Sequence, residues 1–335
     1  MKSDDVRGRR IYLGLSGGVD SAVSAALLKD AGAEVHCVFV KGWYPPGMPC
    51  TWAEDRRDAM RVAARLGLPF ETLDGSSEYK ESVIDYLLNE YAAGRTPNPD
   101  VMCNRDVKFG VLYRHAMAHG ADYLATGHYV DGEKDQRYFL WAVPPDVWPK
   151  LTFPLAGKTK AEVRALAAHY RLPVAEKPDS QGVCFLGDIS VDEFLRQTFH
   201  PKPGIALDEA GNTVGQHEGA LLYTLGERVA LLNASLQGPW YVLAKDMRAN
   251  TLTVRATRDS ASPQSEGISF AHPNWLRNPH TVETAQLRYR GPRIRGVVHG
   301  NIFKPSEPCP DARASGQSIV FYDHDERLVG GGILS

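Results

Sequence analysis

The sequence predicts an α/β protein: a Rossmann-like parallel sheet first, then a small mixed central domain and a β-barrel-like C-terminal domain. Three observations lead to this fold class. Apolar strands alternate with helical patterns over residues 1–130, long helical patterns largely end near residue 200, and strands separated by turns dominate from about residue 281. Strands that alternate with helices form a mainly parallel sheet covered on both faces. We therefore expect domains at 1–200, 201–270 and 271–335.

The strands of the first domain are short and apolar. Val35–Val40 is mostly apolar along its whole length, which is typical of a parallel strand that is buried on both faces. The expected strands of this domain are Ile11–Leu15, Val35–Val40, Phe70–Leu73 and Tyr123–Thr126.

The helices are indicated by their periodicity and by the residues that end them. Trp52–Leu66 is followed by Gly67 and Pro69, which stop a helix. Apolar residues recur at three- and four-residue spacing between Tyr79 and Tyr91, and this spacing forms one apolar face. The other expected helices are Ala22–Ala31, Asp106–His119 and Lys160–Tyr170.

The C-terminal part reads as strands and turns. Pro201, Pro203 and Gly204 interrupt the chain after the last long helical pattern. A small mixed segment follows, and then a β-rich domain. Its expected strands are Val282–Tyr289, Ile294–Val298, Gln317–Tyr322 and Leu328–Leu334.

The composition is that of an ordinary soluble protein, with 335 residues, 43% hydrophobic residues and a formal net charge of −2. No apolar run reaches the roughly 18–20 residues that cross a bilayer, and the N-terminus has no apolar stretch of signal-peptide length. We expect a cytoplasmic protein with no membrane partner. The near-neutral charge argues neither for nor against a nucleic-acid partner. Five cysteines without a Cys-x-x-Cys pair do not predict a disulfide framework.

A glycine-rich loop (residues 14–21) lies where the first strand passes into the first helix. It consists of Gly14, Leu15, Ser16, Gly17, Gly18, Val19, Asp20 and Ser21. Glycines allow the backbone to approach an oxyanion, the first amides of a helix donate to it, and Asp20 could hold Mg²⁺. The lysine of an ATPase P-loop is absent, and the spacing of a dinucleotide-binding loop is not met. The string resembles the PP-loop of ATP pyrophosphatases, which cleave ATP to AMP and pyrophosphate.

Two cysteines stand in polar surroundings. We expect Cys103 in a loop before a helix, near Arg105 and Lys108, and Cys184 in a second glycine-containing loop. Nearby positive charge lowers the pKa of a thiol and makes it a better nucleophile. Cys37, by contrast, lies within an apolar strand and reads as a small core residue. We assign no role to Cys50 or Cys309.

Several motifs together resemble the bacterial tRNA-specific 2-thiouridylase family, and the likeness covers nearly the whole chain. The motifs are Ser16–Ser21, Pro97–Cys103, Lys108–Gly110, Ala125–Tyr129, Lys134–Gln136, Asp179–Gly187, Gly215–Gly219, Tyr223–Gly226, Gly316–Ser318 and Gly330–Gly332. The resemblance implies a PP-loop domain that binds ATP and Mg²⁺, and a tRNA whose wobble uridine is flipped out. It also implies a sulfur-donor protein, either a cysteine desulfurase or a sulfur relay.

The resemblance further implies a role for individual residues. Val40 and Gly127 complete the ATP site, and Asn98, Pro99 and Asp100 contact the target base, Asp100 also in catalysis. Cys184 carries a persulfide and Cys103 is the nucleophile, so that a Cys103–Cys184 disulfide remains after transfer. Lys134, Asp135, Gln136, Arg288 and Tyr289 contact tRNA. An iron–sulfur cluster on Cys103 and Cys184 is a second possibility, which no ferredoxin-like spacing supports.

Residues 288–295 contain four arginines, Arg288, Arg290, Arg293 and Arg295. In an extended strand the first two share one face, as do the last two. Guanidinium groups suit phosphates, and Tyr289 could stack on a base. A solvated strand face would have the same local charge, and the family resemblance favours the RNA-binding interpretation.

Three departures from the family pattern affect regions expected to contact tRNA. The segment between Tyr129 and Lys134 is short, Arg137 stands where the family prefers serine, and Glu227–Ala230 replaces Gln-Arg-Lys-Gly in part. One alternative is the same chemistry on a free nucleobase or another small carbonyl compound. Another is a catalytically idle tRNA-binding protein, against which the glycine-rich loop and both cysteines argue. A monomer is favoured.

Overall fold

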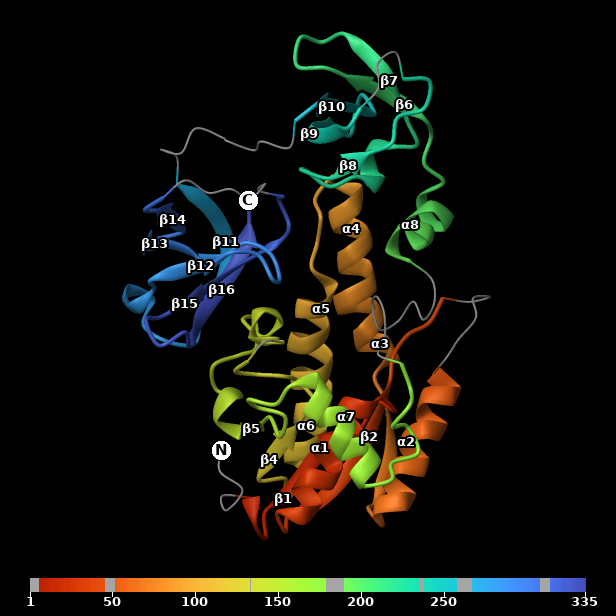
Figure 1. The fold of residues 1–335 in the computed structure, drawn as a ribbon, viewed down its shortest axis with the longest axis vertical. Coiled ribbons are helices and arrows are strands. Elements are labelled where there is room, and N and C mark those ends of the chain that lie inside the picture. The colour runs from red at the N-terminus through yellow and green to blue at the C-terminus, as the bar shows by residue number, and fades with distance from the viewer. Residues whose placement is uncertain are drawn as a thin grey trace. The chain divides into compact units, whose positions relative to one another are not determined.

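The computed structural model of the chain describes residues 6–45, 52–132, 134–178, 190–234, 238–257, 267–307 and 314–335. The chain forms two compact units, one from residues 1–83 and 100–189, the other from 84–99 and 190–335 (Figure 1). The first unit contains a five-stranded parallel sheet. The second contains a five-stranded mixed sheet and a closed six-stranded antiparallel barrel. These three sheets confirm the predicted fold class.

The parallel sheet of the first unit has the strand order β3-β2-β1-β4-β5. The strands are β1 (Arg10–Gly14), β2 (Glu34–Lys41), β3 (Phe70–Asp74), β4 (Tyr123–Ala125) and β5 (Leu151–Thr152). Leu13 of β1 lies in register with Cys37 of β2 and with Ala125 of β4. The chain adds strands to one side of β1 and then to the other, so the winding reverses between β1 and β4. In open α/β sheets, ligands bind at the carboxyl ends of the strands at such a reversal.

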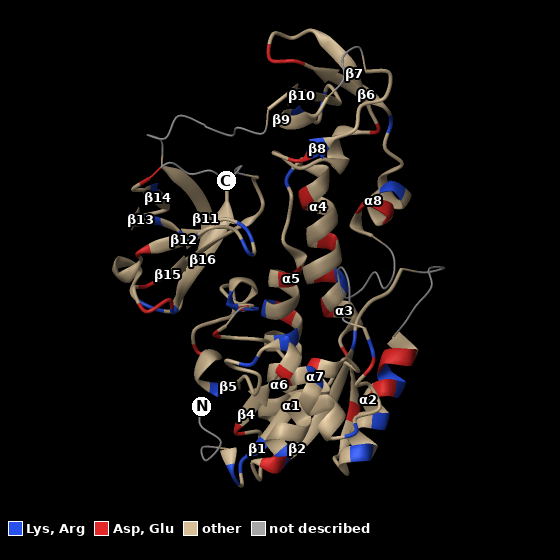
Figure 2. Cartoon of the chain, viewed as in Figure 1, with Lys and Arg blue, Asp and Glu red and all other residues tan. Residues whose placement is uncertain are grey.

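Helices cover both faces of this sheet, as the alternation of side chains along β1 requires. Ile11 and Leu13 pack with α1 (Val19–Asp30), α2 (Trp52–Leu66) and α7 (Lys160–His169). Tyr12, between them, packs on the other face with Phe109 and Leu112. Along α2, acidic residues lie at the N-terminal end and basic residues further on (Figure 2). This order suits the helix dipole.

Two helical stretches contain π-helical turns. The first runs through α3 (Ser76–Tyr79), η2 (Lys80–Asp85) and α4 (Tyr86–Ala92), and the second through α5 (Pro99–Met102), η3 (Cys103–Val111) and α6 (Leu112–Ala118). The prediction of a loop around Cys103 is therefore wrong, because the helix begins at Pro99. Proline suits the first position of a helix, where its missing N–H is not needed. Cys103 is thus held on a π-helical turn, a geometry that is frequent at functional sites.

The second unit has α8 (Val191–Phe199), a mixed sheet in the order β7-β6-β10-β9-β8, and the barrel. The mixed sheet contains β6 (Gly204–Leu207), β7 (Thr213–His217), β8 (Arg228–Val229), β9 (Trp240–Asp246) and β10 (Thr251–Arg255). The barrel contains β11 (Ile268–Trp275), β12 (Thr284–Gln286), β13 (Ile294–His299), β14 (Ile302–Pro305), β15 (Ser318–Tyr322) and β16 (Leu328–Leu334). Phe270, Phe303 and Phe321 pack in the barrel core. None of the described helices is long and apolar enough to cross a membrane.

The predicted strand Val282–Tyr289 is wrong at its C-terminal end. β12 stops at Gln286, whose Nε2 donates to the carbonyl of Gly291 at 2.9 Å, and the amide of Gly291 donates to the carbonyl of Arg288 at 2.9 Å. Arg290 has φ of +59°, which an extended strand does not allow. The two arginines at 288 and 290 therefore lie in a tight turn and do not share a strand face.

Candidate active site

The glycine-rich loop joins β1 to α1 at the reversal point of the sheet. Its two serines bind each other, with 3.1 Å between Ser16 Oγ and Ser21 Oγ, and Ser21 Oγ also accepts from the amide of Ser16 at 3.1 Å. The N-cap of α1 is Gly18, which has no side chain to cap the first amides of the helix. Amides at a helix N-terminus that lack a capping side chain are a ready anion site.

Two glycines are required here by close approach. Gly17 has φ of +83°, and a Cβ on it would lie 2.2 Å from the carbonyl oxygen of Asp55 in α2. Gly127 follows β4, and a Cβ on it would lie 2.8 Å from the amide nitrogen of Ser21. The turn after β4 therefore packs directly on the first turn of α1. Gly127 and the glycine-rich loop, which the sequence assigns to one site, do lie together.

Val40 lies near the carboxyl end of β2, at the same edge of the sheet. A Cβ on Gly75 would contact Val40 Cγ1 at 3.1 Å and Val107 Cγ1 of η3 at 3.9 Å. The end of β2 and the helix that carries Cys103 are therefore close neighbours. The carboxyl ends of β1, β2 and β4 thus bring together every residue that the sequence assigns to ATP.

Asp20 lies in the first turn of α1 and has two hydrogen-bond donors. The hydroxyl of Tyr129 donates to Asp20 Oδ1 at 2.7 Å, and Lys160 Nζ forms an ion pair with the same oxygen at 2.7 Å. Lys160 is the first residue of α7, directly after Thr159, whose hydroxyl caps the helix by accepting from the amide of Glu162. Sequence reasoning missed Lys160, which supplies at this site the positive charge that the glycine-rich loop lacks.

Two ionisable side chains, Asp100 and His128, interact with the ammonium of Lys108 on η3. Burial raises the pKa of Asp100 above its ordinary value, and the Lys108 ammonium opposes this. Burial, followed by the same ammonium, holds the pKa of His128 well below its ordinary value, so this imidazole is neutral. His128 Nδ1 lies 2.8 Å from Thr126 Oγ1. A half-buried carboxyl with a raised pKa, beside a lysine, is a candidate for proton transfer.

Replacing Asp100 by asparagine is expected to stabilise the fold at neutral pH. The folded-state pKa is raised, so above that pKa the native state holds a buried charge, and stability is lost as pH rises through it. The free energy of unfolding in urea should be higher for Asp100→Asn than for wild type near pH 7. The difference should vanish below about pH 4, where aspartate is protonated in the unfolded chain as well. Exposed Asp146→Asn is the control and should match wild type throughout.

Cys103 is buried at the start of η3. Its neighbour Asn104 is 2% exposed and donates from Nδ2 to the carbonyl of Phe139 at 3.0 Å, while its Oδ1 has no partner among the described residues. Cys184, Cys50 and Cys309 lie outside the described residues. Cys37 fits its interpretation as a core residue, since burial raises the pKa of its thiol to about 12.

The described chain stops just before the segment that carries Cys184, and its last part is firmly held. Lys177 Nζ binds Asp55 Oδ1 at 2.8 Å and Asp58 Oδ2 at 2.7 Å, both on α2. Arg164 of α7 donates to the carbonyl of Lys177 at 2.6 Å. Lys177 is therefore tied to α2, the helix that also contacts Gly17.

The segment Lys134–Gln136 is tied to the turn after β4. The backbone amide of Tyr129 donates to Gln136 Oε1 at 2.9 Å, and the amide of Gln136 donates to the carbonyl of Tyr129 at 2.8 Å. Arg137, a departure from the family pattern, bridges Asp131 at 2.8 Å and Asp135 at 2.8 Å. This double ion pair braces the short turn, and gives the arginine at this position a structural role.

Comparison with known proteins agrees with this architecture. Residues 9–188 match a family model described as the tRNA methyl transferase HUP domain, and residues 192–256 match one described as the tRNA methyl transferase PRC-barrel domain. The tRNA-specific 2-thiouridylase MnmA of Geobacillus thermodenitrificans is 40% identical, over 97% of this chain and 94% of the relative. The enzyme of the same name from Flavobacterium johnsoniae is 36% identical, over 98% of this chain and all of the relative.

The chain belongs to the tRNA-specific 2-thiouridylase family. The family resemblance predicted from the sequence motifs is confirmed over nearly the full length. Among solved structures, a 4-thiouridine synthetase in complex with RNA and ATP has a TM-score of 0.41 and 23% identity, over 55% of this chain and 46% of that one.

In this 2-thiouridylase-family chain, the remaining residues predicted to contact the base or the tRNA are divided between the units. Asp100 falls in the first unit, and Asn98, Pro99, Arg288 and Tyr289 fall in the second. Arg288 is exposed and Tyr289 half-buried at the turn after β12. The guanidinium of Arg290 lies 5.3 Å from the centre of the Tyr289 ring. The turn thus holds cations and one aromatic ring close together.

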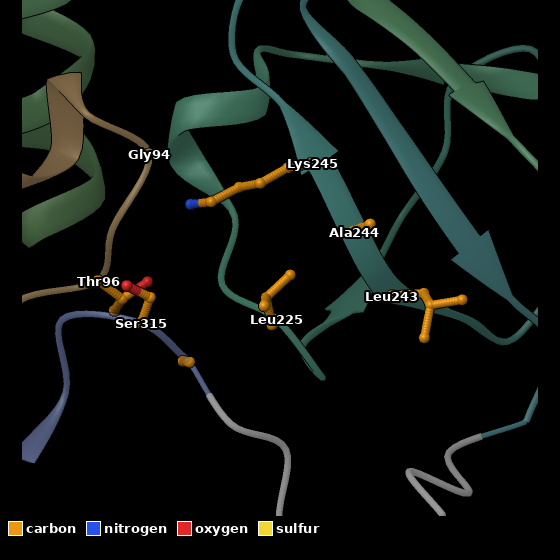
Figure 3. A pocket seen from close by; sticks show the side chains of 8 residues that line it. Gly94, Thr96, Leu225, Leu243, Ala244, Lys245 and Ser315 are labelled. Carbon is orange, nitrogen blue, oxygen red and sulfur yellow. The ribbon is translucent and has the colours of Figure 1, made fainter. Parts of the chain in front are cut away.

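A pocket of about 260 Å³ lies within the second unit and contains none of the predicted site residues (Figure 3). It is lined by Gly94, Thr96, Leu225, Leu243, Ala244, Lys245, Ala314 and Ser315. Lys245 Nζ donates to the carbonyl of Tyr223 at 2.8 Å. Burial lowers the pKa of Lys245 to about 8, although Glu227, the acid that departs from the family pattern, opposes the shift.

The half-buried Lys245 predicts a measurable pH dependence of stability. The folded-state pKa of Lys245 is lowered to about 8, so between about pH 8 and 10.5 the unfolded chain binds more protons at this residue than the folded chain does. The free energy of unfolding therefore rises as pH rises through that window. Lys245→Met should therefore be more stable than wild type at pH 7, and its advantage should shrink towards pH 10.5. Denaturant titrations across this range test this, with exposed Lys202→Met as the control. A constant difference at all pH values would contradict the lowered pKa.

Proposed function

We propose that this protein is a tRNA-uridine 2-sulfurtransferase that uses ATP to replace the C2 oxygen of the wobble uridine by sulfur. Its relatives carry the name tRNA-specific 2-thiouridylase over their whole length, and this is the observation that carries the proposal. The family-model descriptions speak of methyl transfer instead. A buried cysteine at the start of η3, a helix that neighbours the carboxyl end of β2, is in keeping with thiol chemistry on an activated carbonyl.

The first half-reaction is adenylation. A uracil carbonyl is a poor electrophile until its oxygen becomes a phosphate leaving group, so the C2 oxygen attacks the α-phosphate of ATP and pyrophosphate departs. The amides at the start of α1, the two serine hydroxyls and Lys160 stabilise the phosphate charge. Gly127 lets the turn after β4 approach the nucleotide, and Val40 borders it. Asn98, Pro99 and Asp100 hold the base.

Asp20 is the residue we propose to hold Mg²⁺. Its Oδ1 already binds one cation, the ammonium of Lys160, so the position favours positive charge. Its carboxylate fits a magnesium ion, which prefers oxygen ligands and usually needs only one or two carboxylates from the protein. When bound, the ion supplies charge to the departing pyrophosphate. Lys160 would then be released from Asp20 towards the phosphates.

The second half-reaction exchanges oxygen for sulfur. The outer sulfur of a Cys184 persulfide attacks C2, and AMP leaves with the former C2 oxygen. The Cys103 thiolate then attacks Cys184 Sγ, which breaks the sulfur–sulfur bond, leaves the thiocarbonyl on the base and forms the Cys103–Cys184 disulfide. In the variant route, Cys103 first releases hydrosulfide from the persulfide, and hydrosulfide attacks C2. Either way Cys103 supplies two electrons, and a thiol reductant restores both cysteines.

The same proposal covers partners and organisation. A cysteine desulfurase or a sulfur relay would load Cys184, and Lys134, Asp135, Gln136, Arg288 and Tyr289 would contact the tRNA. We favour this persulfide route over an iron–sulfur cluster. We also propose that the protein is a cytoplasmic monomer with domains at 1–200, 201–270 and 271–335. Iron-free protein that retains full activity after chelation would support the persulfide. Activity that requires reconstituted iron and sulfide would favour the cluster.

The test is to incubate the protein with ATP, Mg²⁺, a persulfide donor and unmodified tRNA, and to analyse the digested nucleosides by mass spectrometry. We expect 2-thiouridine, or a derivative of it, from the wobble position, with one pyrophosphate released for each sulfur transferred. A methylated nucleoside would favour the alternative chemistry in the family-model descriptions. Thiolation of a free nucleobase, without any on tRNA, would contradict the proposed substrate.

A further inference from the structure

Tyr129 contacts several separate segments of the first unit. It is 4% exposed, two residues beyond Gly127 in the turn after β4. Its hydroxyl donates to Asp20 Oδ1 at 2.7 Å, and its backbone amide and carbonyl are both paired with Gln136, at 2.9 and 2.8 Å. The ring itself lies 6.0 Å from the ammonium of Lys134 and 5.9 Å from that of Lys160.

These contacts of Tyr129 reach two different parts of the site. Asp20 and Lys160 belong to the phosphate side of the site, at the starts of α1 and α7. Lys134 and Gln136 belong to the segment expected to contact tRNA. A buried tyrosine ring has few accessible rotamers, and its face attracts cations while its hydroxyl favours a carboxylate. The Tyr129 side chain therefore lies between Lys134, in the segment expected to contact tRNA, and the pair Asp20 and Lys160, on the phosphate side of the site.

We propose that Tyr129 is a positioning residue that couples tRNA contact at Lys134–Gln136 to ATP binding at the glycine-rich loop. This rests on the proposed function, because it takes ATP and tRNA as the two ligands. When an RNA phosphate draws Lys134 away, the ring loses one of its two cations, and its hold on Lys160 and Asp20 changes. When ATP and Mg²⁺ draw Lys160 and Asp20 away, the turn that holds Gln136 is loosened in the same manner.

The sign of the coupling follows from this arrangement. In the unliganded site, Asp20, Lys160 and Lys134 are all held around the Tyr129 side chain. The first ligand to bind must break part of this cluster, and the second then has less to break. Each ligand should therefore strengthen binding of the other, and by the same factor in either order.

The test compares Tyr129→Phe with Tyr170→Phe. The first removes only the hydroxyl that binds Asp20. The second removes a hydroxyl that donates to Asp30 Oδ2 at 2.5 Å. This is also a tyrosine–aspartate hydrogen bond, and it joins the C-terminal ends of α7 and α1, whereas Lys160 and Asp20 lie at their N-terminal ends. The affinity for a non-hydrolysable ATP analogue with Mg²⁺ is measured with and without saturating unmodified tRNA. The affinity for tRNA is measured with and without the analogue.

For wild type and Tyr170→Phe we expect about tenfold tighter binding of each ligand in the presence of the other. For Tyr129→Phe we expect about threefold, because phenylalanine keeps the ring between the two lysines and loses the link to Asp20. Tenfold coupling retained in Tyr129→Phe would overturn the proposal, as would equal loss in both variants, which indicates general loosening of the helices. Wild type that binds both ligands without coupling would overturn it and leave the proposed function intact. Wild type that binds neither ligand would overturn the proposed function itself. Should Tyr129→Phe not fold, Gln136→Ala tests the other end of the link and should also weaken the coupling.

Discussion

Replacing Cys103 by serine is expected to reduce 2-thiouridine formation by roughly a thousandfold or more, while pyrophosphate release continues. In the proposed mechanism this thiol supplies the two electrons that break the sulfur–sulfur bond, and a serine hydroxyl cannot. Adenylation precedes that step and uses the glycine-rich loop at the carboxyl end of β1. The variant should therefore release AMP and stop with the base joined to Cys184 through a disulfide, or, in the hydrosulfide route, accumulate adenylated tRNA.

The matched control is Cys37→Ala. Cys37 is also buried in the first unit, but in the middle of β2, where burial raises the pKa of its thiol to about 12. This variant should lose some stability and keep normal sulfur transfer per folded molecule. Single-turnover assays with persulfide-loaded protein give both the sulfur transferred and the pyrophosphate released. Undiminished thiolation by Cys103→Ser would refute the role of Cys103.

Replacing Lys160 by methionine is expected to lower kcat/KM for ATP in the pyrophosphate-release reaction by about a hundredfold or more. Lys160 is the cation that the glycine-rich loop itself lacks, and it stands at 2.7 Å from Asp20. Its loss removes positive charge from the place where negative charge develops on the phosphates. Methionine keeps most of the length of the side chain, so the packing of α7 on α1 through Val163 and Ala167 should survive.

Lys158→Met is the control for Lys160→Met. It removes one lysine charge two residues earlier, before the N-cap of α7. Pyrophosphate release by this variant should stay within about twofold of wild type. Lys160→Arg should recover part of the rate because it keeps the charge with a different geometry. If Lys160→Met matched Lys158→Met, phosphate binding would not depend on Lys160.

Local sequence was sufficient for the elements that have strong periodicity and for the loops that have distinctive residues. α2 extends over the predicted range of Trp52–Leu66, and β16 over the predicted Leu328–Leu334. Both elements depend on neighbours in the chain, which a sequence pattern records. The place of Gly127 against Ser21 is a long-range contact, and only the family resemblance puts Gly127 in the same site as the glycine-rich loop.

Features that depend on distant packing were missed. Lys160 and Asp20 are 140 positions apart, and only the packing of α7 on α1 brings them together. The links from Tyr129 likewise need the turn after β4 to fold onto α1. The π-helical turn at Cys103 was mistaken for a loop because Asn98 and Pro99 are typical turn residues, although proline also begins helices. At Arg288, the four arginines predict a strand face, whereas residues 288–291 form a turn closed by the hydrogen bond from the amide of Gly291 to the carbonyl of Arg288.

The central claim is that the C2 oxygen of uridine leaves on AMP and is replaced by sulfur. A tRNA that carries heavy oxygen at C2 of its wobble uridine tests this directly, when it is incubated with ATP, Mg²⁺ and persulfide-loaded protein. The proposed mechanism predicts that the label appears in the phosphate of AMP, in an amount equal to the 2-thiouridine formed. Thiolated tRNA together with unlabelled AMP, or label retained in the product base, would contradict it.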